Sequence, residues 1–148
     1  MYPAIAKSFK QAGFQWATQF AYDPLAIANV NTEYQTHYLN LAYTPGKAIS
    51  MLIASEAFHK LQRRKDYGTY PADSVFDVFR VSYKEALSEM NTDQKFYYSN
   101  STQTKPVNAA KLTNIAGVGN SPIVKYTGTG AYFLDKVEDG VWRLEVMP

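Results

Sequence analysis

Residues 14–40, FQWATQFAYDPLAIANVNTEYQTHYLN, decide how the rest of the chain is interpreted. Phe14, Trp16 and Phe20 alternate with smaller or amide side chains, which is the two-residue period of a β-strand with two unlike faces. Such a strand packs helices against its bulky face and turns its small face toward the filled interior of a barrel. We therefore expect residues 14–20 to form one strand, with Trp16 buried under helices.

The segment that follows this strand carries the kinds of side chain that a sugar-binding site uses. Aromatic rings stack on the apolar faces of sugars, while carboxylates and amides hydrogen-bond to hydroxyl groups. Asp23 and Glu33 are a candidate carboxylate pair, and a glycosidase needs one such group as acid and one as nucleophile or base. Two acids in a polar loop more often line the rim of a ligand site, so we expect binding rather than catalysis here. The predicted substrate-binding residues are Gln19, Tyr22, Asp23, Glu33, Tyr34 and His37.

One helix is predicted before this stretch and one after it. Residues 1–13 place apolar groups at three- and four-residue steps, Pro3 suits a first helical turn, and Gly13 ends the pattern. Residues 44–61 begin with Pro45 at the first helical position and carry apolar groups around most of the circumference, so this helix is expected to be well buried. The order helix, strand, loop, helix is that of a parallel α/β unit.

The second half of the chain is predicted to be an antiparallel β domain. Residues 66–73 contain Gly and Pro without any period and are interpreted as a linker, which divides the chain into residues 1–65 and 74–148. The expected strands lie in 75–83 and at 96–98, 123–126, 130–134 and 141–146, and glycine-rich residues 115–122 are expected to form a turn. Because the last predicted strand is followed at once by Pro148, the β domain is expected to be truncated. The predicted fold class is α+β.

Composition restricts the partners. A net charge of +2 gives no electrostatic case for nucleic acid, and no apolar run is long enough to span a membrane. The chain has no cysteine and two distant histidines, and Gly117–Asn120 lacks the helix and lysine of a phosphate loop, so neither a metal nor another cofactor is expected. Twelve tyrosines exceed eight phenylalanines, which is typical of proteins whose rings keep a polar edge near water, including carbohydrate binders.

The stretches FQWATQFAYDP and NTEYQTHYLNLAYTP, followed by a helix, resemble the end of the (β/α)8 barrel of large bacterial carbohydrate-active proteins, in particular the clan A glycoside hydrolases. On this resemblance residues 1–13, 14–20 and 44–61 would be the seventh helix, eighth strand and eighth helix of a TIM-type barrel. The stretches RVSYKEALSEM and TGAYFLDKVEDGVWRLEVMP resemble the start of the β-sandwich-like domain that is often appended to such barrels.

The resemblance implies that catalysis and substrate binding lie in different parts of the full-length protein. The catalytic glutamates of clan A end the fourth and seventh barrel strands, so both are expected before Met1, and this chain would supply the rim of the pocket. It implies the C-terminal fragment of an exported bacterial glycoside hydrolase, located in the periplasm, at the outer membrane or outside the cell, with a polysaccharide or oligosaccharide as substrate. The alternatives are a non-catalytic carbohydrate-binding protein and a structural β module.

Overall fold

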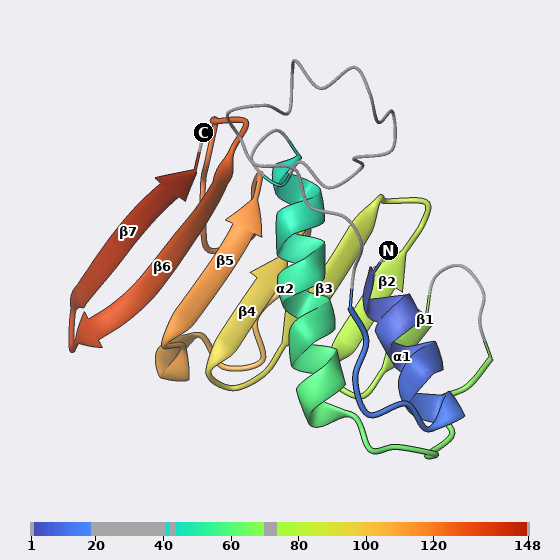
Figure 1. The fold of residues 1–148 in the computed structure, drawn as a ribbon. Helices are drawn as coiled ribbons and strands as arrows, with labels where there is room; N and C mark the ends of the chain where they lie inside the picture. Colours follow the sequence, from blue (N-terminus) through green and yellow to red (C-terminus); the bar gives the residue numbers. More distant parts are fainter. Residues whose placement is uncertain (1, 19–40, 42–43, 70–73, 148) are drawn as a thin grey trace.

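The computed structural model describes residues 2–18, 41, 44–69 and 74–147. Two helices precede a seven-stranded open sheet, so the predicted α+β class is confirmed at this level (Figure 1). Helix α1 (Tyr2–Ala12) and helix α2 (Pro45–Lys60) match the two predicted helices. Both helices lie across the same face of the sheet (Figure 1), where α1 contacts β2 and α2 contacts β3 to β6.

The strands follow one another across the sheet in sequence order. Neighbours pair antiparallel except β4 and β5, which are parallel, and the crossover between these two includes a 3-10 turn, η1 (Ala109–Lys111). The strands are β1 (Ser74–Phe76), β2 (Phe79–Ser82), β3 (Leu87–Asn91), β4 (Lys95–Tyr98), β5 (Asn114–Val118), β6 (Ala131–Glu138) and β7 (Val141–Met147).

Each face of the sheet carries its own hydrophobic cluster. Adjacent residues of a strand point to opposite faces, and Tyr97 accordingly joins the cluster under the helices while Phe96 and Tyr98 join the other. The helix-side cluster contains residues of α1 and α2 together with residues of β1 to β6, for example Ile53 of α2 and Met90 of β3. The opposite cluster is completed by residues from the connections, among them Leu112 and Val124.

Several sequence predictions need correction. Residues 14–18 form no strand, because no strand of the described part of the chain pairs with them, and residues 19–20 lie outside that part. No strand forms at 123–126 either, whereas residues 115–118, predicted to belong to a turn, lie in β5 (Asn114–Val118). Helix α2 is buried along one stripe, Ile49, Ser50, Ile53 and Ala57, rather than around most of its circumference.

The predicted linker at 66–73 stays a prediction, since residues 70–73 lie outside the described residues. The described helices on one side of it and the described strands on the other nevertheless share the helix-side cluster. Unfolding experiments on this shared core therefore test the proposed division of the chain.

Candidate functional site

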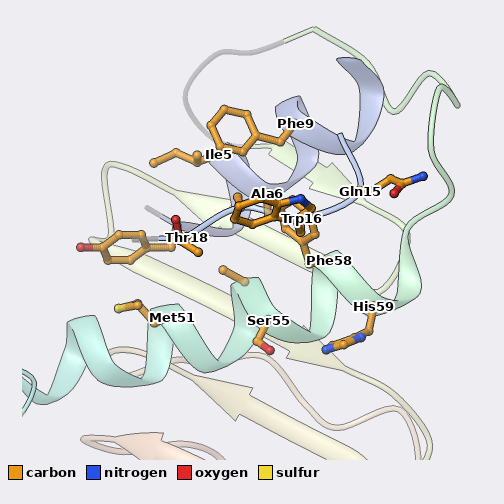
Figure 2. A pocket seen from close by; sticks show the side chains of 13 residues that line it. Ile5, Ala6, Phe9, Gln15, Trp16, Thr18, Met51, Ser55, Phe58 and His59 are labelled. Atoms are coloured by element: carbon orange, nitrogen blue, oxygen red, sulfur yellow. The ribbon is translucent and has the colours of Figure 1, made fainter. Parts of the chain in front are cut away.

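A groove lies between α1, residues 15–18 and α2 (Figure 2). Its volume is about 390 Å³, within the usual range for small-molecule sites. We call it the helix groove. Its walls combine aromatic rings with short polar groups: the rings include Phe9, Trp16 and Phe58, and the polar groups include Gln15, Ser55 and His59.

The end of α1 explains how residues 15–18 come to form one wall. Gly13 takes a φ of +93° and its N–H donates to the carbonyl of Lys10 at 3.0 Å, while the Phe14 N–H donates to the carbonyl of Phe9 at 3.0 Å. These are the two hydrogen bonds of a Schellman motif, and the Phe9 and Phe14 rings supply its hydrophobic contact with centroids 5.3 Å apart. The chain therefore turns back along α1 directly after Gly13.

Helix α1 presents its large apolar side chains to the groove, whereas its small residues Ala4 and Ala6 belong to the helix-side cluster. Ile5 and Phe9 are exposed and line the groove, whereas Lys7 and Lys10 on the opposite stripe are buried. Both lysines keep partners for their ammonium groups: Lys7 donates to the Gly68 carbonyl at 3.4 Å, and the Lys10 Nζ lies 5.5 Å from the centroid of the Phe58 ring. The aliphatic stems cover apolar surface while the charged ends reach polar or aromatic groups.

Helix α2 supplies the second wall. Met51, Ser55 and His59 are four residues apart, which places them on one face of the helix, and all three line the groove. Ser55 and His59 are exposed, so their hydroxyl and imidazole groups are available to a ligand. Figure 2 shows this face running along the groove from Met51 to His59.

Trp16 lies in the wall formed by residues 15–18, and this residue is 71% exposed. The prediction that helices bury this ring is therefore wrong. The physical reason is that residues 14–18 have no neighbouring strand among the described residues to press them against the helices. An indole ring that stays accessible beside hydrogen-bonding groups is a surface on which a flat apolar group can stack.

The direction of residues 15–18 is the reverse of that of α2. Gln15 lies toward His59 near the C-terminal end of α2, whereas Thr18 lies toward Met51 nearer its N-terminal end (Figure 2). This is the direction that a strand takes between two helices in an α/β unit, in which functional side chains follow the carboxyl end of the strand.

None of the predicted substrate-binding residues lies in the described part of the chain: Gln19, Tyr22, Asp23, Glu33, Tyr34 and His37 all fall within residues 19–40. Their roles stay predictions. In the sequence they begin at the residue after Thr18, which lines the helix groove. Sequence reasoning did not find Ser55 and His59, although their four-residue spacing on a helix was a usable signal.

A buried carboxylate lies on β3, away from the groove. Glu89 is 2% exposed and pairs with the guanidinium of Arg80 at 3.0 Å, and it accepts hydrogen bonds from the hydroxyls of Thr102 and Thr104, the latter at 3.0 Å. Burial lowers the pKa of Arg80, and its hydrogen bonds to Glu89 and Glu85 raise that pKa above the usual value. Each carboxylate oxygen has a partner, so this group is structural.

Two tyrosine hydroxyls meet beneath the opposite face of the sheet. Tyr98 and Tyr132 hydrogen-bond to each other, the hydroxyls of Tyr98 and Ser121 share a hydrogen bond at 3.0 Å, and Tyr132 donates to the Gly119 carbonyl at 3.0 Å. Burial raises the pKa of both phenols. The protonated network fixes the connection that covers this face.

The described residues contain no group of three or more histidine, aspartate or glutamate side chains placed to hold a metal ion. Neither described helix has the length and apolar character that crossing a bilayer requires. Comparison of the chain with protein-family models, with curated proteins and with solved structures gave no match.

Proposed function

We propose that this chain binds carbohydrate at the helix groove, as the substrate-binding and non-catalytic part of an exported glycoside hydrolase acting on a polysaccharide or oligosaccharide. The observation that carries the proposal is the exposed ring of Trp16 in a groove that is also lined by the polar side chains of Gln15, Ser55 and His59. In addition, Thr18 lines the groove, and the side chains predicted to bind sugar, from Gln19 to His37, follow it directly in the sequence.

The chemistry of the groove walls fits a pyranose. An accessible indole stacks on the apolar face of a sugar ring, and the Gln15 amide, the Ser55 hydroxyl and the His59 imidazole offer donors and acceptors to its hydroxyl groups. Because the described lining contains no lysine, arginine, aspartate or glutamate, the groove suits a neutral polyhydroxylated ligand better than a phosphate or a carboxylate.

The residues that line the groove in the described part of the chain favour binding over cleavage. Glycoside hydrolysis needs two carboxyl groups flanking the bond, and no aspartate or glutamate is among these lining residues. Asp23 and Glu33 are proposed to contribute to the rim of the site. The catalytic glutamates are proposed to lie in a part of the enzyme that precedes Met1, and the location outside the cytoplasm belongs to the same proposal.

The same proposal includes an origin for the helical half of the chain. We interpret α1, residues 14–20 and α2 as the segments that would form the last αβα part of a TIM-type barrel. Residues 14–18 form no strand here, and on this interpretation they would become one only beside the other strands of the barrel. The reversed direction of residues 15–18 relative to α2 supports this interpretation. In addition, α1 and α2 run in the same direction in Figure 1, as successive helices of a barrel do.

The sequence offers a clean test, because the chain has two tryptophans and they lie in different places. Trp16 lines the groove and Trp142 lies on β7. In a Trp142→Phe background, a panel of neutral oligosaccharides is expected to change the fluorescence of Trp16 in a saturable way. In the matched Trp16→Phe background the same sugars are expected to leave the fluorescence of Trp142 unchanged.

Calorimetry with the same panel provides the second readout. Trp16→Ala is expected to weaken binding by about fivefold to a hundredfold, the loss of one stacked ring, whereas Trp142→Ala is expected to bind like the wild type. Equal affinity of the wild type and Trp16→Ala would reject the groove as the binding site. Reducing-sugar release from the natural full-length protein separates a hydrolase from a protein that only binds glycan.

A further inference from the structure

Strand β7 forms one edge of the sheet and is exposed along its whole length. In the described part of the chain it pairs only with β6, so its other side presents free backbone N–H and C=O groups. Long exposed edges of this kind pair readily with another strand. The other edge of the sheet, β1, is only three residues long.

The two faces of β7 differ in character. Trp142, Leu144 and Val146 stand beside Lys136, Leu134 and Tyr132 of β6 and extend the face on which the Tyr98–Tyr132 pair lies. All three are exposed, and Leu144 is 59% exposed. An uncovered row of apolar side chains next to an existing hydrophobic cluster is an interaction surface.

Charge on the opposite face of β7 indicates which partner fits. When two copies of one strand pair antiparallel about a twofold axis normal to the sheet, one residue lies opposite itself. Centring on Leu144, the middle of β7, pairs all seven residues of the strand and places Arg143 opposite the partner's Glu145 in both halves. Centring on Arg143 or on Glu145 instead would place like charges against each other and shorten the paired segment.

The same register is favourable on the apolar face. Leu144 meets Leu144 of the second copy, and Trp142 meets the partner's Val146, an aromatic group opposite a β-branched one. Within each copy Arg143 pairs with Asp135 of β6 at 2.8 Å and with its own Glu145 at 3.4 Å, so the charges of this face already lie together. The register centred on Leu144 therefore allows backbone hydrogen bonds along the whole strand, opposite charges on one face and apolar contacts on the other.

We propose that two copies of this chain associate through β7, antiparallel and centred on Leu144, to form one continuous sheet. The helices of both copies then lie on the same side of that sheet. This interface is separate from the helix groove, because none of the groove residues lies on β7.

The test measures the mass of the 148-residue chain by sedimentation velocity over a micromolar concentration series. The wild type is expected to dimerise. Arg143→Glu and Glu145→Arg are each expected to weaken the dimer by about tenfold or more, because two attractive pairs become two repulsive ones. An equimolar mixture of these two variants is expected to restore a dimer, since all four charges then face opposite charges. Val75→Lys on β1, the other edge of the sheet, is the control and is expected to dimerise like the wild type.

A cross-link tests the register without any change of charge. The chain contains no cysteine, so Leu144→Cys introduces one thiol that would lie next to its symmetry mate and is expected to form a covalent dimer on mild oxidation. Val75→Cys, at a position that is 74% exposed, is expected to stay monomeric under the same conditions. A wild type that is monomeric throughout, a mixture of charge variants that fails to associate, or Leu144→Cys that cross-links no faster than Val75→Cys would overturn the proposal.

Discussion

Shortening Ile53 to alanine measures how firmly the helices are coupled to the sheet. Ile53 is 0% exposed and belongs to the cluster that α1 and α2 share with β1 to β6. Removing a buried isoleucine side chain down to Cβ costs about 2–5 kcal/mol in unfolding free energy. For a chain of 148 residues this corresponds to a drop in Tm of roughly 5–15 °C.

Two probes of thermal unfolding separate the possible outcomes. Far-ultraviolet circular dichroism follows the helices, and hydrogen exchange followed by mass spectrometry reports on the strands separately. If helices and sheet share one core, Ile53→Ala lowers both transitions together. Ile5→Ala is the control, because Ile5 is 48% exposed and its loss is expected to cost under about 1 kcal/mol. A drop confined to the helical probe, with protection of β3 and β5 unchanged, would refute the shared core and support separate units at 1–65 and 74–148.

Three further predictions concern the sheet. Gly117→Ala is expected to destabilise the fold by about 1–3 kcal/mol, measured by urea unfolding, because the new Cβ would lie 2.6 Å from the Cζ of Tyr98 and 2.7 Å from the hydroxyl oxygen of Tyr132; a neutral effect would contradict this packing. Burial raises the pKa of Tyr98 and Tyr132. The stability that these two phenols contribute is therefore present below the unfolded tyrosine pKa of about 10 and is lost as pH rises above it. If the ultraviolet absorbance of both phenolates appeared at the ordinary tyrosine pKa while the fold persisted, the two rings would not be buried. Hydrogen bonds from Arg143 and, to a smaller extent, Asn114 lower the pKa of Asp135. The stability that the Asp135 carboxylate contributes is therefore present above the unfolded carboxyl pKa of about 3.9 and is lost as pH falls below it. Asp135→Asn is expected to reduce the dependence of the unfolding free energy on pH in this acidic range.

The helix boundaries were predictable because their signals are local. Gly13 adopts the positive φ that a helix C-terminus favours, and Pro45 occupies the first position of α2. The hairpin of β6 and β7 was also predictable, since Asp139-Gly140 marks its turn and Gly140 has a φ of +79°. These features depend on neighbouring residues alone.

Strands β3 and β5 were not predicted, because their patterns depend on distant partners. The sequence of β3, LSEMN, reads as polar, yet Ser88 and Glu89 are buried and hydrogen-bonded to side chains far along the chain. In β5 Gly117 indicates a turn by sequence, whereas in the structure it leaves room for the Tyr98 ring. Residues 14–18 show the converse case: the alternation of a strand is present, but no described strand pairs with them.

Some features of the helix groove were also predictable from local sequence, and others depended on distant parts of the chain. Aromatic and amide groups around Phe14 to Gln19 were recognised from composition and alternation, and Trp16 was placed on the bulky face. Its exposure was not predictable, because it depends on which neighbouring strands are present. The contribution of α2 was missed because its apolar residues outweigh Ser55 and His59 in the sequence pattern.

The most direct test of carbohydrate binding is the fluorescence titration of Trp16 in the Trp142→Phe chain with neutral oligosaccharides. Our account predicts a saturable change that matches the affinity from calorimetry, is lost in the Trp16→Phe chain, and is unaffected by Glu145→Arg on β7. No change with any sugar, while calorimetry reports binding elsewhere or none at all, would contradict the account.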